Sequence, residues 1–154
     1  MVKADAYGHG MLRIAVRALK EGAAMLGVAT VDEALALRRA GIAAPILVLV
    51  QPADDCLSAL AEYGLRAMIS SVAAAERLGL LAHRANKVAP IHCKIDTGMG
   101  RQGFGLDDAV REIHRLTRVA NVDIDGVATH FPQADVRGDA FTLDQIKTFK
   151  QILR

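Results

Sequence analysis

Cysteine and long apolar runs are scarce in this sequence. Cys56 and Cys93 are the two cysteines, and neither belongs to a CxxC pair or to a Cys/His pair with zinc-ligand spacing. The cysteines therefore indicate neither a disulfide framework nor a metal site. No stretch approaches the ~20 apolar residues of a membrane-spanning helix, and the first residues lack the pattern of a secretion signal. We therefore expect a cytoplasmic protein that does not bind membranes.

Charge of one sign is also missing. The formal net charge is +2, and no basic run is long enough to follow nucleic-acid phosphates, so nucleic-acid binding has no support. Aromatic residues make up only 4% of the 154 residues, whereas hydrophobic residues make up 52%. A chain of this size and composition can bury one core, with alanine-rich helices packed closely on a sheet.

Short apolar runs alternate with amphipathic runs along the whole chain. We expect a short first strand that ends before Lys3, and helix starts with capping-box spacing at Thr30 and Thr142. Ser70 or Ser71 and Asp107 or Asp108 are candidates for two other helix starts. The five further strands are predicted at about 25–29, 45–50, 65–69, 89–95 and 122–129, and the helices at about 12–19, 30–41, 54–63, 71–86, 107–116 and 142–153.

This βα pattern, repeated about six times, predicts an α/β fold with a parallel sheet and right-handed crossovers. An open doubly wound sheet and a closed barrel both satisfy the pattern. Three polar and glycine-rich segments follow the first, fifth and sixth predicted strands at their carboxyl ends. A barrel brings such strand ends around one opening, so the spread favours a TIM-type barrel.

The first of these segments, residues 2–10, reads VKADAYGHG and places Lys3 at the end of a strand-like run. A lysine amine can form a Schiff base with an aldehyde cofactor, of which pyridoxal phosphate is the usual one. Glycines 8 and 10 allow the backbone to approach a ligand closely. On spacing alone, a solvated lysine beside a turn is the simpler interpretation.

Residues 2–10 closely resemble the lysine segment of the alanine racemase family. Two more segments match that family in type and order, residues 94–104, KIDTGMGRQGF, and residues 126–131, GVATHF. The resemblance covers nearly the whole chain. It implies an eight-stranded (β/α) barrel followed by a β-rich domain, so residues 1–154 would be an incomplete pyridoxal-phosphate-binding barrel without the last two strands and the C-terminal domain.

The resemblance also implies an activity. Family members interconvert L- and D-alanine, which supplies D-alanine for peptidoglycan precursors, and they use pyridoxal phosphate as cofactor. Lys3 would bind the cofactor aldehyde and move the α-proton of the substrate. The intact family forms homodimers in which the second base is a tyrosine from the partner's C-terminal domain. Nothing in this chain corresponds to that tyrosine, so we expect the isolated chain to be inactive and to bind the cofactor weakly.

Four other residues match family site positions. Tyr7 would bind the cofactor phosphate, and Arg101 would hold the ring hydroxyl and the substrate carboxylate. His130 would lie near the cofactor ring. Lys94 matches a lysine that is carbamylated in some members, and a salt bridge to Asp96 would be the simpler alternative for it.

Three alternatives to an alanine racemase stay open from the sequence. The chain could belong to a broad-specificity amino-acid racemase, to a non-catalytic pyridoxal-phosphate-binding barrel protein, or to a barrel part with only a structural role. In each case an incomplete barrel has unpaired strand edges, which favour association with other chains.

Overall fold

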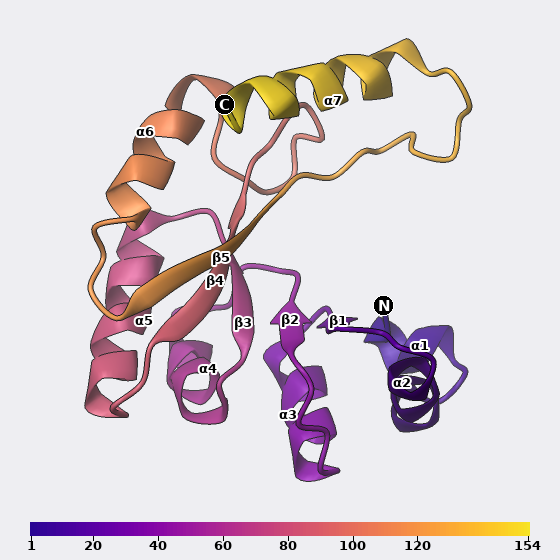
Figure 1. Cartoon of the computed structure of the whole chain (residues 1–154), viewed down its shortest axis with the longest axis vertical. Helices are drawn as coiled ribbons and strands as arrows, with labels where there is room; N and C mark the ends of the chain where they lie inside the picture. Colours follow the sequence, from indigo (N-terminus) through magenta and orange to yellow (C-terminus); the bar gives the residue numbers. More distant parts are fainter.

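Five strands form one parallel sheet and lie side by side in the order in which they occur in the chain (Figure 1). In the computed structural model, which describes residues 1–154, they are β1 (Leu26–Val28), β2 (Ile46–Val48), β3 (Arg66–Ile69), β4 (Ala89–Lys94) and β5 (Val122–Ala128). A doubly wound sheet reverses its strand order at a switch point. The unbroken order seen here is that of a barrel wall, so the predicted α/β fold with a partial TIM-type barrel is confirmed.

Helices precede, connect and follow the strands. They are α1 (Lys3–Tyr7), α2 (Met11–Lys20), α3 (Val31–Arg39), α4 (Leu57–Tyr63), α5 (Val72–Arg84), α6 (Leu106–Leu116) and α7 (Ala140–Ile152), with a 3₁₀ turn at Asp54–Cys56. Figure 1 shows α3, α4 and α5 along the sheet, while α7 crosses beyond the carboxyl ends of β4 and β5. None of the helices combines the length and apolar composition needed to cross a lipid bilayer.

The two faces of the sheet differ in character. On β4, Ile91 and Cys93 are fully buried in the main hydrophobic core, which also contains Leu78 of α5. Successive side chains of a strand point to opposite faces, so His92 and Lys94 lie on the other face. That face is the inner wall of the partial barrel, and it positions polar side chains toward the carboxyl ends of the strands.

The predicted first strand is not formed as a strand. The amide N–H of Val2 donates to the carbonyl of Gly27 at 2.8 Å, which is the one ladder-like bond on this side of β1. From Ala4 to Gly8 the backbone has positive φ angles, so the extended conformation ends before a second bond can form. The structure therefore has five strands where the sequence pattern predicts about six.

Most helix boundaries follow the predictions, but two helix starts differ. Thr30 and Glu33 form the predicted capping box of α3, and Ser71 caps α5. At α7, however, the cap is Asp139, whose carboxylate accepts from the amide of Thr142 at 2.6 Å. The Thr142 capping box is wrong because Gln145, its expected partner, is buried.

The start of α6 also differs from the prediction. Gly105 is the residue before the helix, and Asp107 and Asp108 lie within the first turn. Acidic side chains there still interact favourably with the positive end of the helix dipole. The two aspartates therefore stabilise this helix start without capping it.

Candidate functional site

One cavity collects most of the side chains singled out in the sequence. It has a volume of about 420 Å³ and lies at the carboxyl ends of the strands, and Lys3, Lys94, Arg101 and His130 all line it. The remaining lining residues are Met1, Ala29, Leu49, Val50, Met68, Met99, Gln102 and Thr129. Three predicted segments that lie far apart in the chain therefore meet at one site.

The charge of this cavity is strongly one-sided. Two lysines, an arginine and a histidine line it, and no aspartate or glutamate is among the lining residues. A concave surface with cationic groups of one sign concentrates anions. The cavity therefore suits a ligand with negatively charged oxygens, and its lysine amines could react with a carbonyl group.

Lys3 enters the cavity at the start of an unusual turn. Ala4, Asp5, Ala6 and Tyr7 have φ angles of 51°, 52°, 53° and 55°, which form a short left-handed helix. This conformation costs an L-residue roughly 1–2 kcal/mol, so four successive residues hold it only if the surroundings stabilise it. Ala6 is buried and the carboxylate of Asp5 accepts from the amide of Met11 at 2.6 Å.

Lys94, the last residue of β4, is only 8% exposed. It forms no salt bridge with Asp96 or with any other carboxylate, which removes the simpler alternative considered for it. Burial lowers the pKa of the Lys94 amine, the positive charge of Arg101 lowers it further, and Asp96 partly opposes the shift. A buried lysine with a lowered pKa is more nucleophilic at neutral pH than an exposed one.

The turn that carries Arg101 is held by Asp96. The carboxylate of Asp96 accepts from the amides of Gly98 at 2.9 Å and Gly100 at 3.1 Å. Burial by itself would raise the pKa of Asp96, but these backbone donors lower it overall. The carboxylate of Asp96 is therefore ionised and accepts its hydrogen bonds from the turn. It forms no salt bridge with the cationic side chains that line the cavity.

His130 follows β5, the strand next to β4, and lines the same cavity. Burial lowers the pKa of its imidazole, and Arg101, Lys94 and Lys3 lower it further. The imidazole is therefore uncharged at neutral pH. An uncharged histidine beside an arginine can accept a hydrogen bond, which fits an orienting role better than proton donation.

A buried polar network joins the segments that carry Arg101 and His130. The hydroxyls of Thr97 and Thr129 lie 2.7 Å apart, and the side-chain amide of Gln145 on α7 donates to Thr97 Oγ1 at 3.1 Å. The same amide donates to the carbonyl of His130 at 3.4 Å. Gln145 was not predicted as a site-supporting residue, because its spacing from Thr142 also fits a capping box.

Tyr7 is the candidate that the structure does not bring into the cavity. Its side chain is 63% exposed, and the amine of Lys3 lies 6.0 Å from the centre of its ring. Its ring lies near Lys3, and its hydroxyl forms no hydrogen bond within the chain.

Gln102 is a lining residue whose role the sequence left open. Its side-chain nitrogen is buried and has no hydrogen-bond partner, although an unpaired buried donor is unfavourable. Because Gln102 follows Arg101 directly, this donor adds to the polar groups that can receive an anionic ligand.

A charged cluster lies beside this site on the inner face of the sheet. The carboxylate of Asp125 on β5 contacts Arg66 on β3 at 2.5 Å and the imidazole of His92 on β4 at 3.1 Å. Gly126 makes room for that imidazole, since a Cβ atom there would lie 2.6 Å from the ring. The cluster ties three strands together on the face that carries Lys94.

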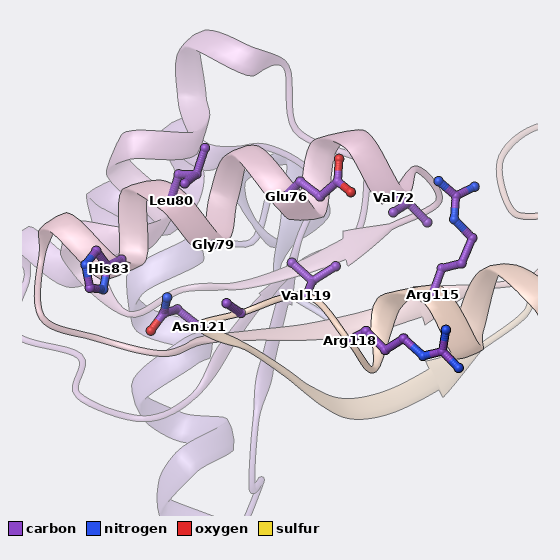
Figure 2. A pocket seen from close by; sticks show the side chains of 10 residues that line it. Val72, Glu76, Gly79, Leu80, His83, Arg115, Arg118, Val119 and Asn121 are labelled. Carbon is purple, nitrogen blue, oxygen red and sulfur yellow. The ribbon is translucent and has the colours of Figure 1, made fainter.

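A larger cavity of about 550 Å³ lies elsewhere, between α5 and residues 118–121 (Figure 2). Figure 2 shows Glu76, Leu80 and His83 of α5 on one side and Val119 and Asn121 on the other. None of the sequence-predicted site residues lines it. We therefore assign the functional site to the smaller cavity, which the predicted residues line.

The sequence of residues 1–154 matches the family described as "Alanine racemase, N-terminal domain". The chain belongs to this family. Among family members, the alanine racemase of Clostridium tetani is 41% identical over 150 residues, which are 97% of this chain and 39% of that protein.

Solved structures of the family agree with the fold. The alanine racemase of Clostridium difficile 630 superposes with a TM-score of 0.95 and 33% identity, covering 99% of this chain and 40% of that one. The histidine racemase of Leuconostoc mesenteroides subsp. sake superposes with a TM-score of 0.88 and 27% identity, covering 97% and 40%. This chain therefore spans about two fifths of the length of these relatives.

Proposed function

We propose that this chain forms part of an amino-acid racemase that interconverts L- and D-alanine, with pyridoxal phosphate held at Lys3. The observation that carries the proposal is the shared cavity, which Lys3 and Arg101 both line and which has no acidic residue among its lining side chains. Membership of the alanine racemase N-terminal domain family supports the same activity.

The residues present fit such a cofactor. Pyridoxal phosphate brings an aldehyde, a phenolate oxygen and a phosphate, and the cavity offers lysine amines, a guanidinium and the unpaired buried amide donor of Gln102. When bound, the cofactor acidifies the α-proton of an amino acid by delocalising the negative charge that remains. The protein then needs to orient the substrate and to move one proton on each face.

Each proposed residue has a separate task. Lys3 holds the aldehyde and moves the α-proton at its Nζ atom. Arg101 binds the substrate carboxylate and the ring hydroxyl, for which its planar fork is suited. His130, uncharged, orients a neighbouring cationic group, and Tyr7 at the rim contacts the phosphate.

Lys94 is proposed to be carbamylated. Two cationic groups repel in this cavity, and a carbamate on Lys94 would turn the repulsion from Arg101 into a charge-assisted hydrogen bond. Carbon-13 NMR in the presence of labelled bicarbonate tests this: a carbamate resonance that disappears in Lys94→Arg is expected. No such resonance, or one that persists in the variant, would contradict it.

We further propose that the working protein has the remaining two barrel strands, a β-rich C-terminal domain and a homodimeric arrangement. The support is that the chain covers 39% of the C. tetani relative and that β5 pairs only with β4. A second base from a partner would complete the reaction, so the 154-residue chain alone is expected to be inactive.

Reductive labelling tests the proposal. The chain is incubated with pyridoxal phosphate, treated with borohydride and mapped by mass spectrometry, and an absorbance band of the bound cofactor is followed in parallel. We expect weak labelling that favours Lys3 and disappears in Lys3→Ala, while Lys87→Ala serves as the control because Lys87 does not line the cavity. Labelling that is equal among exposed lysines, or unaffected by Lys3→Ala, would contradict the proposal.

A racemase of other amino acids is the second candidate, since the histidine racemase of L. mesenteroides has the same fold over this region. Racemisation of L-alanine and L-histidine by the longer protein that contains this chain separates the two substrates. A protein that binds the cofactor but racemises neither would be a non-catalytic barrel protein.

A further inference from the structure

We propose that Glu33 is a positioning residue that fixes the backbone on which Lys3 stands. This inference rests on the proposed function of Lys3. Glu33 lies at the start of α3, 30 residues further along the chain, and lines no part of the cavity. It acts through hydrogen bonds to peptide groups.

The carboxylate of Glu33 joins two separate segments. Oε1 accepts from the amide of Ala4 at 2.7 Å, and Oε2 accepts from the amide of Ala29 at 2.7 Å. No lysine or arginine forms an ion pair with Glu33, so its charge is directed at peptide N–H groups. Bonds from N–H groups to an ionised acceptor are shorter and stronger than those to a neutral one.

These contacts exceed what a helix cap requires. From the glutamate side chain, a capping box requires only the bond that it accepts from the Thr30 amide. This bond is the longest of the three that the Glu33 carboxylate accepts, at 3.3 Å. The two short bonds go to Ala4 and Ala29. The carboxylate is therefore placed for linking the Lys3 turn to the end of β1 and only secondarily for capping α3.

Lys3 is fastened on both sides as a result. Before it, the amide of Val2 donates to the carbonyl of Gly27 in β1. After it, the amide of Ala4 is held by Glu33, which also holds the residue that follows β1. The backbone at a residue's own Cα sets the direction of its Cα–Cβ bond, so these two bonds fix the direction from which the Lys3 side chain enters the cavity.

The left-handed turn makes this fastening necessary. Ala4 is the first residue of the turn and has a φ angle of 51°, a conformation that an alanine rarely adopts without support. Loss of the Glu33 bond would let the peptide between Lys3 and Ala4 rotate toward ordinary conformations. The Lys3 amine would then leave the position at which it meets an aldehyde in the cavity.

The experiment compares Glu33→Gln and Glu33→Ala with Thr30→Ala in the 154-residue chain. Thr30→Ala removes the other half of the capping box, the bond from the Glu33 amide to Thr30 Oγ1, but leaves the Ala4 contact. Glutamine keeps the size of Glu33 and has one acceptor oxygen, so it cannot serve both segments. Circular dichroism confirms that each variant is folded.

Two measurements are made on each variant. We expect the Ala4 amide to exchange with solvent about tenfold faster in both Glu33 variants, the factor that corresponds to loss of one hydrogen bond. We expect reductive labelling of Lys3 by pyridoxal phosphate to fall by about tenfold or more, because small misplacements of a reacting group slow its reaction strongly. Thr30→Ala should leave both quantities near their original values.

The results separate this inference from the proposed function. Unchanged Ala4 exchange in the folded Glu33 variants would overturn the inference, as would equal loss of Lys3 labelling in Thr30→Ala. If the original chain shows no preference for Lys3 in labelling, the proposed function fails, and the exchange measurement still decides whether Glu33 fixes the turn.

Discussion

Lys94 has an unusual environment for a lysine, since it is 8% exposed and forms no salt bridge with an acidic residue. Its burial in the charged form should destabilise the fold. We predict that Lys94→Met stabilises the 154-residue chain in bicarbonate-free buffer at about pH 7, by about 1 kcal/mol, because a hydrophobic side chain of similar length replaces an unpaired charge. Urea unfolding of both proteins measures the difference.

The pH dependence of this difference has a definite sign. The pKa of Lys94 is lowered in the folded chain, so the unfolded state binds the proton more tightly and stability rises with pH between the folded pKa and 10.5. The advantage of Lys94→Met should therefore be full below the folded pKa and should shrink as the pH approaches 10.5. A variant that is less stable than the original chain at about pH 7 would contradict the prediction.

At the residue scale, three sequence motifs pointed to side chains that the structure places around one cavity. Lys3, Lys94, Arg101 and His130 were named from three segments, and all four line one cavity. Glu33 was predicted only as part of a helix cap. Its bond from the Ala4 amide depends on the left-handed turn at residues 4–7, and the residue types in that segment do not predict such a turn.

Among the elements, the turn between β4 and α6 packs closely against the end of β4. Gly103 has a φ of +141°, and a Cβ atom there would lie 2.3 Å from the amide nitrogen of Asp96. Two backbone hydrogen bonds close the turn onto the end of β4. The amide of Asp96 donates to the carbonyl of Phe104, and the amide of Phe104 donates to the carbonyl of Lys94. Any side chain at position 103 would push this turn, and Arg101 with it, away from the strand.

We predict that Gly103→Ala lowers the free energy of unfolding by at least about 2 kcal/mol, through backbone strain and the close contact. Gly105→Ala is the matched control, because Gly105 has a φ of −64° and open space around its Cα. That variant should lose less than about 1 kcal/mol, the value of a helix cap. Equal losses in urea unfolding would show that the turn tolerates a side chain.

Helices and inner strands were predictable because local signals agree with the fold. Capping residues marked the starts of α3 and α5, Gly41 marked the end of α3, and branched residues marked β2. The first strand was predicted wrongly. An extended run forms a strand only if the residues after it stay extended, and here the chain turns at Ala4. The α7 cap failed because the burial of Gln145 is decided by Thr97, which is 48 residues away in sequence.

For the whole molecule, the sheet has two edges. β5 pairs only with β4, and on its other side β1 receives a single bond from Val2. The backbone groups along the free edge of β5 can pair with another chain. The alternation of strands and helices made the barrel-type fold predictable. The two edges exist because the five strands do not close into a complete barrel.

We predict that the 154-residue chain associates at micromolar concentration. Sedimentation velocity over a range of concentrations should show species heavier than the 16.4 kDa monomer, increasing with concentration. A monodisperse monomer throughout that range would mean that the edge of β5 is protected by its own twist or charges.

The mirror-image turn after Lys3 carries a consequence for the chirality of the chain itself. Residues 4–7 adopt angles that are ordinary for D-amino acids and unfavourable for the L-residues that a ribosome supplies. Position 4 is exposed, so a synthetic chain with D-alanine there would enter the turn without steric conflict. The backbone next to Lys3 thus has a conformation that suits a D-amino acid better than an L-amino acid.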